Sequence, residues 1–142
     1  MSDLSELSCA VRDPNYAYAA AQFRDFIIPL ERTILFHALG SDELELIKRS
    51  GWTQFPSRSR EEPLFYPILT EEYATQVAKE AYVEVDGVGW VIKSAVSTDF
   101  VRKYDVQQIG ASYQREYWIP AAELADLNRH LVGPIEVLAE LR

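Results

Sequence analysis

A strand-like segment at residues 113–119 places one carboxylate, Glu116, among aromatic and aliphatic side chains. Successive residues of a strand point to opposite faces, so Gln114, Glu116 and Trp118 share one face. The opposite face carries the alternate residues, Tyr113, Arg115, Tyr117 and Ile119. If this second face packs on the core, Glu116 lies beside an amide and a flat ring on a surface suited to a small polar ligand. An edge strand with a solvated glutamate is the alternative interpretation.

Apolar runs and capped helical patterns divide the rest of the chain into short elements. Apolar and β-branched runs predict strands at residues 33–39, 64–66, 106–109, 113–119 and 135–141. Ser41-Asp42-Glu43 and Thr70 are predicted to cap helices at residues 41–50 and 70–81. Helical patterns predict two further helices at residues 97–104 and 121–130. The dipeptide Asp86-Gly87 predicts a β-hairpin over residues 83–96. We therefore predict an α+β domain with short, mostly antiparallel strands and three to five helices.

The length of 142 residues suits one domain that forms its own core without disulfides or metal. A helical pattern follows Asp13-Pro14, where a helix begins readily. We predict an N-terminal helical extension over residues 1–32 that packs on the body of the protein. Residues 33–142 then make up the main domain.

Charge and composition exclude several classes of function. The chain has 14 Lys and Arg against 22 Asp and Glu, a net charge of −8, which disfavours a nucleic-acid partner. No apolar run approaches the roughly 20 residues that span a bilayer, and residues 1–9 lack an export signal. Cys9 is the only cysteine, and His37 and His130 lie in unrelated contexts, which argues against a metal site. We expect a cytoplasmic protein with neither a nucleic-acid nor a membrane partner.

Three dispersed residues carry a family resemblance. His37 on the first strand, Tyr73 on the helix after the second strand and Glu116 on a late strand follow one another in that order. The order resembles the His-Tyr-Glu triad of diphtheria-toxin-like ADP-ribosyltransferases, and Gln114 with Glu116 resembles the Q-x-E turn of other branches. Over residues 33–142, strings such as Glu-Tyr-Trp-Ile-Pro are also similar to small bacterial proteins labelled as related to ADP-ribosylation and crystallin J1.

The resemblance implies an ADP-ribosyltransferase-like domain over residues 33–142 that uses NAD as its substrate, with a protein as one candidate acceptor. Cleavage of the bond between nicotinamide and ribose generates positive charge on the sugar, as in glycosidases. Glu116 is then the catalytic residue, because a fixed carboxylate opposes that charge. Gln114 is expected to orient the acceptor or the attacking water.

The resemblance also implies the residues that bind the cofactor. Tyr73 would stack on nicotinamide, and Tyr66 and Tyr82 are further candidates for that contact. His37 would form a hydrogen bond with a ribose hydroxyl or with the cofactor backbone. The basic pair of the loop at residues 53–63, which consists of Arg58 and Arg60, would bind the pyrophosphate.

Each candidate also has a structural interpretation. His37 could be a buried histidine of an apolar strand, Tyr73 a core tyrosine, and Arg58 and Arg60 solvated loop charges. The chain as a whole also fits a non-catalytic binding or regulatory protein of the immunity type, which holds a partner with its acidic and aromatic surface. The two functions differ in one geometric expectation. An NAD-cleaving enzyme requires His37, Tyr73 and Glu116 to surround one cleft, with the loop at 53–63 near its mouth.

Overall fold

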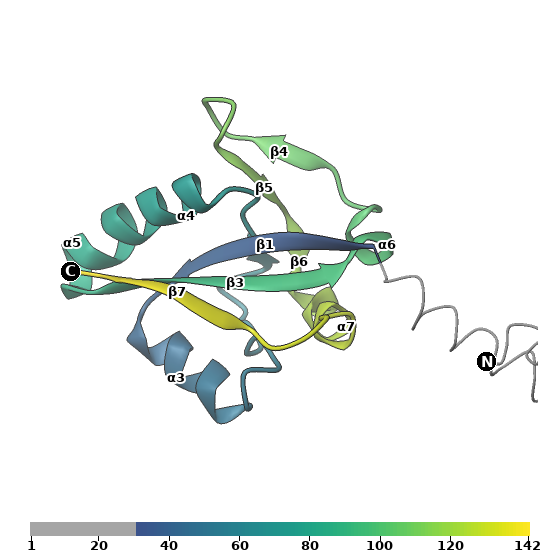
Figure 1. The fold of residues 1–142 in the computed structure, drawn as a ribbon, viewed down its shortest axis with the longest axis horizontal. Helices are drawn as coiled ribbons and strands as arrows, with labels where there is room; N and C mark the ends of the chain where they lie inside the picture. Colours follow the sequence, from purple (N-terminus) through teal and green to yellow (C-terminus); the bar gives the residue numbers. More distant parts are fainter. Residues whose placement is uncertain (1–30) are drawn as a thin grey trace, which may run out of the picture. The chain divides into compact units, whose positions relative to one another are not determined.

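A three-stranded antiparallel sheet of β1 (Arg32–Leu39), β3 (Gly89–Ser97) and β7 (Glu136–Leu141) forms the centre of the domain, in the order β1-β3-β7 (Figure 1). The computed structural model describes residues 31–142. The chain divides into two units, Met1–Glu31 and Arg32–Arg142. The helical extension predicted over residues 1–32 therefore lies outside the described residues, apart from its last two.

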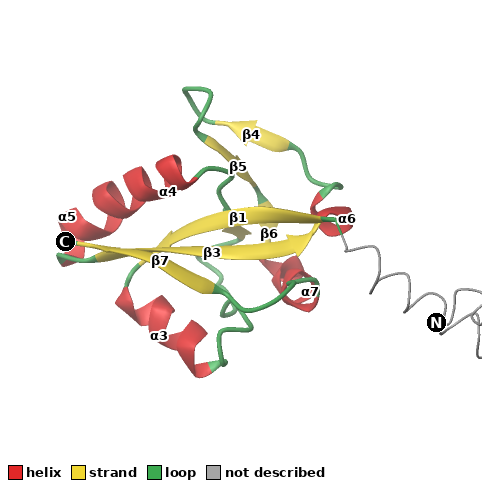
Figure 2. Cartoon of the chain, viewed as in Figure 1, coloured by secondary structure: helices red, strands yellow, loops and turns green. Residues whose placement is uncertain are grey.

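Helices and short strand pairs surround the central sheet (Figure 2). The remaining strands are β2 (Leu64–Phe65), β4 (Val106–Gln108), β5 (Arg115–Tyr117) and β6 (Ile119–Pro120). The helices are α3 (Ser41–Arg49), α4 (Glu71–Val77), the π-helix η1 (Ala78–Val83), α5 (Glu84–Asp86), α6 (Thr98–Val101), the 3-10 helix η2 (Ala121–Glu123) and α7 (Leu124–Arg129). The fold is mixed α+β and the strand pairs of residues 31–142 are antiparallel, which confirms that part of the prediction.

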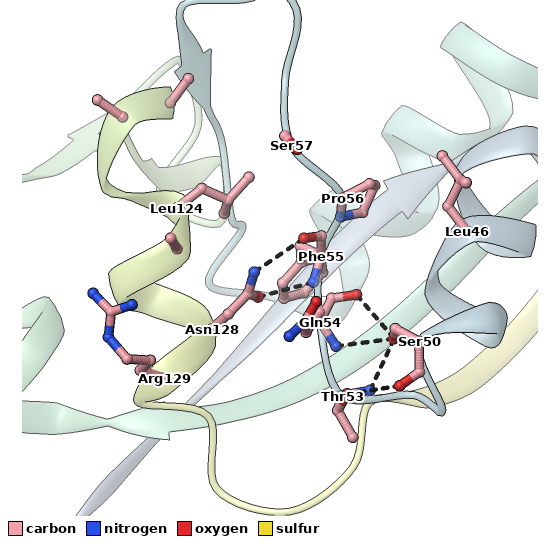
Figure 3. A pocket seen from close by; sticks show the side chains of 13 residues that line it. Leu46, Ser50, Thr53, Gln54, Phe55, Pro56, Ser57, Leu124, Asn128 and Arg129 are labelled. Atoms are coloured by element: carbon pink, nitrogen blue, oxygen red, sulfur yellow. Dashed lines mark hydrogen bonds between the residues drawn. The ribbon is translucent and has the colours of Figure 1, made fainter.

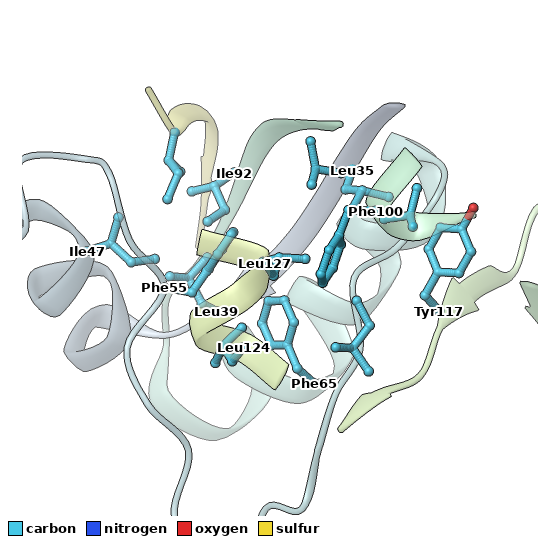
Figure 4. Close-up of a cluster of buried hydrophobic side chains, with 14 residues drawn as sticks. Leu35, Leu39, Ile47, Phe55, Phe65, Ile92, Phe100, Tyr117, Leu124 and Leu127 are labelled. Carbon is cyan, nitrogen blue, oxygen red and sulfur yellow. The ribbon is translucent and has the colours of Figure 1, made fainter. Parts of the chain in front are cut away.

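One face of the central sheet covers the main hydrophobic core. Leu35 and Leu39 on β1 and Ile92 on β3 point to this face, because alternate residues of a strand share a side. They pack against side chains from the loop after α3 and from β2, β5, β6, α6 and α7 (Figure 4). The large buried side chains of this core include Phe55, Phe65, Phe100, Ile119, Leu124 and Leu127. This side supplies most of the buried apolar surface that stabilises the domain.

The opposite face of the sheet packs against the continuous helical segment α4–η1–α5. Its smaller cluster consists of Ala38, Ile68, Ala74, Ala78 and Val91. Small residues allow the helix to approach the strands closely. At Gly89 an added Cβ would lie 2.7 Å from the carbonyl oxygen of Ala78, so this contact requires a glycine. The close approach fixes the helix that carries Tyr73 and Tyr82 against the sheet.

A single residue, Ile68, joins the central sheet to β5. Its backbone forms bridges with Phe36 on β1 and with Glu116 on β5. The Phe36 amide donates to the Ile68 carbonyl at 2.7 Å, and the Ile68 amide donates to the Phe36 carbonyl at 2.8 Å. The β4–β5 pair is therefore tied to the edge of the central sheet. Ile68 alone lies between Glu116 and Phe36, the residue before His37.

The predicted hairpin around Asp86-Gly87 is wrong. Glu84–Asp86 form the last turn of the helical segment, and Gly87 ends it with a φ of 83°. A glycine in the left-handed conformation terminates helices as readily as it forms hairpin turns. The following strand, β3, pairs with β1 and β7 instead of with residues 83–86.

Two further predictions need correction. Ser41 does not cap α3, because Gly40 occupies the N-cap position and no side chain caps this helix. The strand predicted at 113–119 is divided into β5 and β6, with Trp118 between them. Tyr117 and Ile119 face the core as predicted, but Arg115 is exposed and Glu116 is buried.

No helix within residues 31–142 is long and apolar enough to cross a lipid bilayer.

Candidate functional site

A pocket of about 270 Å³ lies at the edge of the sheet, beside β1 and Ile68. It is lined by His37, Ala38, Arg58, Tyr66, Ile68, Tyr73, Val77, Tyr82 and Glu116. Six of these residues were predicted from the sequence as site residues, and they come from β1, the loop after α3, the segment after β2, the α4–η1 helix and β5. His37, Tyr73 and Glu116 thus surround one pocket, as the geometric expectation required.

Glu116 is buried in the middle of β5, where only 9% of its surface is exposed. Its backbone pairs with Gln107 on β4 and forms a bridge with Ile68 on the other side. The indole Nε1 of Trp118 donates a hydrogen bond to Glu116 Oε2 at 2.7 Å. This bond satisfies one oxygen of the buried carboxylate.

Tyr73 reaches the same carboxylate from the first turn of α4. The side chain of Thr70 caps this helix, as predicted, because its Oγ1 accepts from the Tyr73 amide at 3.2 Å. Burial raises the pKa of the Tyr73 hydroxyl, and the charge of Glu116 and a hydrogen bond with it raise that pKa further. Tyr73 therefore stays protonated and is a donor beside Glu116.

His37 lies on β1 against an aromatic wall and is paired with an acidic side chain. Its ring contacts Phe65 at 4.8 Å and Phe55 at 5.8 Å between centroids. His37 Nε2 and Glu43 Oε2 are 3.1 Å apart. Burial alone would raise the pKa of Glu43, but the charges of His37 and Arg58, together with the hydrogen bond to His37, lower it overall. The pair holds the imidazole at the wall of the pocket.

Arg58 is largely buried, with 14% of its side chain exposed, so it is not the solvated loop charge of the structural interpretation. Its guanidinium carbon lies 5.2 Å from the centre of the Phe65 ring. One terminal nitrogen is 3.7 Å from Glu62 Oε2, whereas the buried Nε has no hydrogen-bond partner among the described residues. An unpaired buried donor is costly, which makes Arg58 the part of the pocket best prepared for an anionic group.

Two further tyrosines complete the lining of the pocket. Tyr66 follows β2 and is 41% exposed. Tyr82 lies in the π-helix η1, a type of distortion that often occurs at functional sites. Burial raises the pKa of Tyr82, and the negative charge of Glu43 adds to that effect. Both tyrosines offer ring surface to a planar ligand.

Two predicted residues do not reach the pocket. Arg60 is exposed in the loop and does not line it. Gln114 forms the turn between β4 and β5, where its Oε1 accepts from the Ala111 amide at 2.8 Å and its Nε2 donates to Gln76 Oε1 at 3.3 Å. The side chain that was expected to orient the acceptor or water is therefore used to close a turn.

The sequence reasoning missed the partners of the pocket residues. Glu43 was assigned only to the capping segment of the helix at residues 41–50, and Trp118 only as a flat ring near Glu116. The hydrogen bond from Trp118 could have been found, because residues two apart on a strand lie on one face. The approach of Glu43 to His37 depends on how α3 folds back on β1, which no local pattern in the sequence indicates.

A larger hollow of about 870 Å³ lies between α3, the following loop and α7 (Figure 3). The side-chain amide of Asn128 crosses it: Oδ1 accepts from the Phe55 amide at 2.8 Å, and Nδ2 donates to the Phe55 carbonyl at 3.0 Å. Arg129 is the only charged residue among its lining residues. The hollow lacks a set of convergent ionisable groups, so the smaller pocket is the better candidate for chemistry.

Residues 31–142 contain no cluster of three or more histidine, cysteine or acidic side chains that could hold a metal ion. No protein-family model matches the chain, and no curated protein is significantly similar to it. The chemistry of the site therefore has to be argued from the pocket itself. A buried carboxylate, a tyrosine donor, a histidine and a partly unpaired arginine suit a ligand that has a sugar hydroxyl, a planar ring and an anionic group.

Proposed function

We propose that this chain binds NAD in the pocket between β1, α4 and β5 and cleaves the bond between nicotinamide and ribose. It would do so either as an ADP-ribosyltransferase or as an NAD glycohydrolase, on an ADP-ribosyltransferase-like fold. One observation carries the proposal: His37, Tyr73 and Glu116, which are far apart in the sequence, line the same pocket.

The burial of Glu116 supports its proposed catalytic role. Departure of nicotinamide leaves an oxocarbenium-like ribose, and a carboxylate in a poorly solvated site opposes that charge more strongly than one in water. Hydrogen bonds from Trp118 and Tyr73 occupy two acceptor positions of the carboxylate. A carboxylate has about four acceptor positions, so Glu116 can still accept a hydrogen bond from a ribose hydroxyl.

The size of the pocket indicates which part of NAD would enter it. A volume of about 270 Å³ is below the roughly 300–1,000 Å³ that drug-sized ligands fill. The pocket would therefore hold the nicotinamide and its ribose, with Tyr73 or Tyr66 against the nicotinamide ring. The pyrophosphate would lie at Arg58, whose unpaired Nε supports an anionic partner.

The test is the release of nicotinamide from NAD by the purified full chain, measured by chromatography. In the Glu116→Gln variant we expect turnover to fall by on the order of 100-fold or more, with nearly unchanged apparent affinity, because only transition-state stabilisation is lost. Glu136→Gln is the matched control, since Glu136 is exposed on β7, which β3 separates from β1, and it does not line the pocket.

Three outcomes are informative. Equal loss of turnover in both variants would show an unspecific effect of removing a charge. Full activity of Glu116→Gln would place the catalytic group elsewhere. If the wild-type chain neither binds nor cleaves NAD at millimolar concentration, the proposal fails, and the non-catalytic partner-binding function becomes the better account.

A further inference from the structure

The indole of Trp118 is placed by the strand register directly beside the pocket. The pairs Phe65–Ile119 and Ile68–Glu116 have the same register, so Tyr66 lies opposite Trp118 on the paired segments. Trp118 and Glu116 are two residues apart and share one face, which brings the indole Nε1 to 2.7 Å from Glu116 Oε2. We infer that Trp118 is a positioning residue for Glu116, an inference that rests on the proposed function.

The need for such a residue follows from the flexibility of glutamate. The terminal torsion of a glutamate side chain has a broad energy profile, so packing alone does not fix the plane of its carboxylate. Glu116 is 9% exposed, and water is therefore poorly placed to hold it. The indole of Trp118 donates to Oε2 in addition to the hydrogen bond between Tyr73 and Glu116, so two donors from different elements restrict the plane of the carboxylate.

The exposure of Trp118 argues against a mainly structural role for its ring. The side chain is 42% exposed and does not belong to either hydrophobic cluster of the described residues. Its removal therefore leaves no large cavity in the core. The Nε1–H donor is the part of Trp118 that contacts Glu116. A variant that keeps an aromatic ring but lacks this donor therefore tests the positioning role without removing the packing of the ring.

The Trp118→Phe variant provides that ring. A misplaced catalytic group lowers the rate without weakening the binding of the ground state, so we expect kcat for nicotinamide release to fall by about tenfold or more while KM stays within about threefold of the wild type. Trp90→Phe is the matched control. It also removes an indole donor, whose bond to Ser41 Oγ is 3.4 Å, but Trp90 does not line the pocket.

A second readout does not depend on NAD cleavage. In the ¹H–¹⁵N spectrum of the full chain, the Trp118 indole resonance is assigned by its disappearance in Trp118→Phe. We expect Glu116→Gln to move this resonance upfield and to speed its exchange with water, because a neutral amide is a weaker acceptor than a carboxylate.

The kinetic measurement and the indole resonance test two claims separately: that the chain cleaves NAD, and that Trp118 positions Glu116. A lower kcat in Trp118→Phe with normal KM and normal kcat in Trp90→Phe supports the inference, and unchanged kcat overturns it. A rise in KM alone also overturns it, since Trp118 would then be a binding surface. If the wild type does not cleave NAD, the proposed function fails, and the indole resonance decides whether Trp118 holds Glu116: a response to Glu116→Gln supports the contact, and no response refutes it.

Discussion

At the scale of single residues, Glu116 and His37 each form a hydrogen bond with a partner that does not line the pocket itself. Glu116 is bound by Trp118, and His37 is bound by Glu43. Both contacts leave the held group at the wall of the pocket. A site of this kind is preorganised, because its side chains lose little further freedom when a ligand binds.

The pair His37–Glu43 makes a prediction about acid stability. The pKa of Glu43 in the folded state lies below its ordinary value of 4.5. A lowered carboxyl pKa contributes stability that is complete above the unfolded-state value and is lost as the pH falls through the folded-state value. We expect Glu43→Gln to be less stable than the wild type at about pH 7, and the difference to shrink as the pH is lowered below about 4.

Urea unfolding of both proteins across this pH range measures the effect. Glu45→Gln is a suitable control, because the Glu45–Arg49 ion pair lies on the exposed face of α3 and contributes little. A stability difference for Glu43→Gln that does not change with pH would show that the pair is not ionic in the folded protein.

Most residues of the candidate site could be predicted from the sequence, because residue type and position within an element indicate what a side chain can bind. Contacts between distant segments could not be predicted in this way. Six candidates line the pocket, but Gln114 and Arg60 do not. Gln114 and Glu116 are two residues apart, yet only Glu116 lies within β5, and Gln114 closes the preceding turn. Which of the two loop arginines is buried depends on packing against Phe65, which is a tertiary contact.

At the scale of elements, a short sequence motif predicted the structure correctly where the motif is compatible with only one structure. Thr70 caps α4 as predicted because it both ends an extended segment and offers a hydroxyl acceptor to the first turn. Asp86-Gly87 misled because the same dipeptide fits a hairpin and a helix end. The pairing of β3 decides between these two structures. Because β3 pairs with β1 and β7, residues 83–86 have no strand to pair with.

Asn128 connects two elements and supports a second prediction. Its amide pairs with both backbone groups of the buried Phe55, and so holds the loop that carries Arg58 against α7 (Figure 3). In Asn128→Ala those two groups lose their partners, and we expect the free energy of unfolding to fall by about 2 kcal/mol or more. Affinity for NAD should also fall, because Arg58 is then less well positioned.

Urea unfolding and calorimetric titration with NAD measure the two effects of Asn128→Ala. Gln54→Ala is the control, since Gln54 is exposed in the same loop, and its stability should stay within about 0.5 kcal/mol of the wild type. Unchanged stability of Asn128→Ala would mean that water replaces the amide and that the loop does not depend on α7.

At the scale of the whole domain, the pocket lies where two β-structures are joined by one residue. The central sheet ends at β1, the β4–β5 pair begins beyond it, and Ile68 bridges the two. His37 and Glu116 come from the two sides of this junction, and the α4–η1 helix adds Tyr73 and Tyr82. The sequence predicted the α+β class from its elements. It did not predict this junction, because the bridge at Ile68 involves too few residues to leave a pattern.

The location of bound NAD tests the central claim most directly, and a ¹H–¹⁵N titration of the full chain with NAD measures it. The account predicts chemical-shift changes that concentrate at His37, Ile68, Tyr73 and Glu116, with a smaller set around Arg58. Changes that gather instead around Asn128 in the larger hollow, or no changes at millimolar NAD, would contradict it.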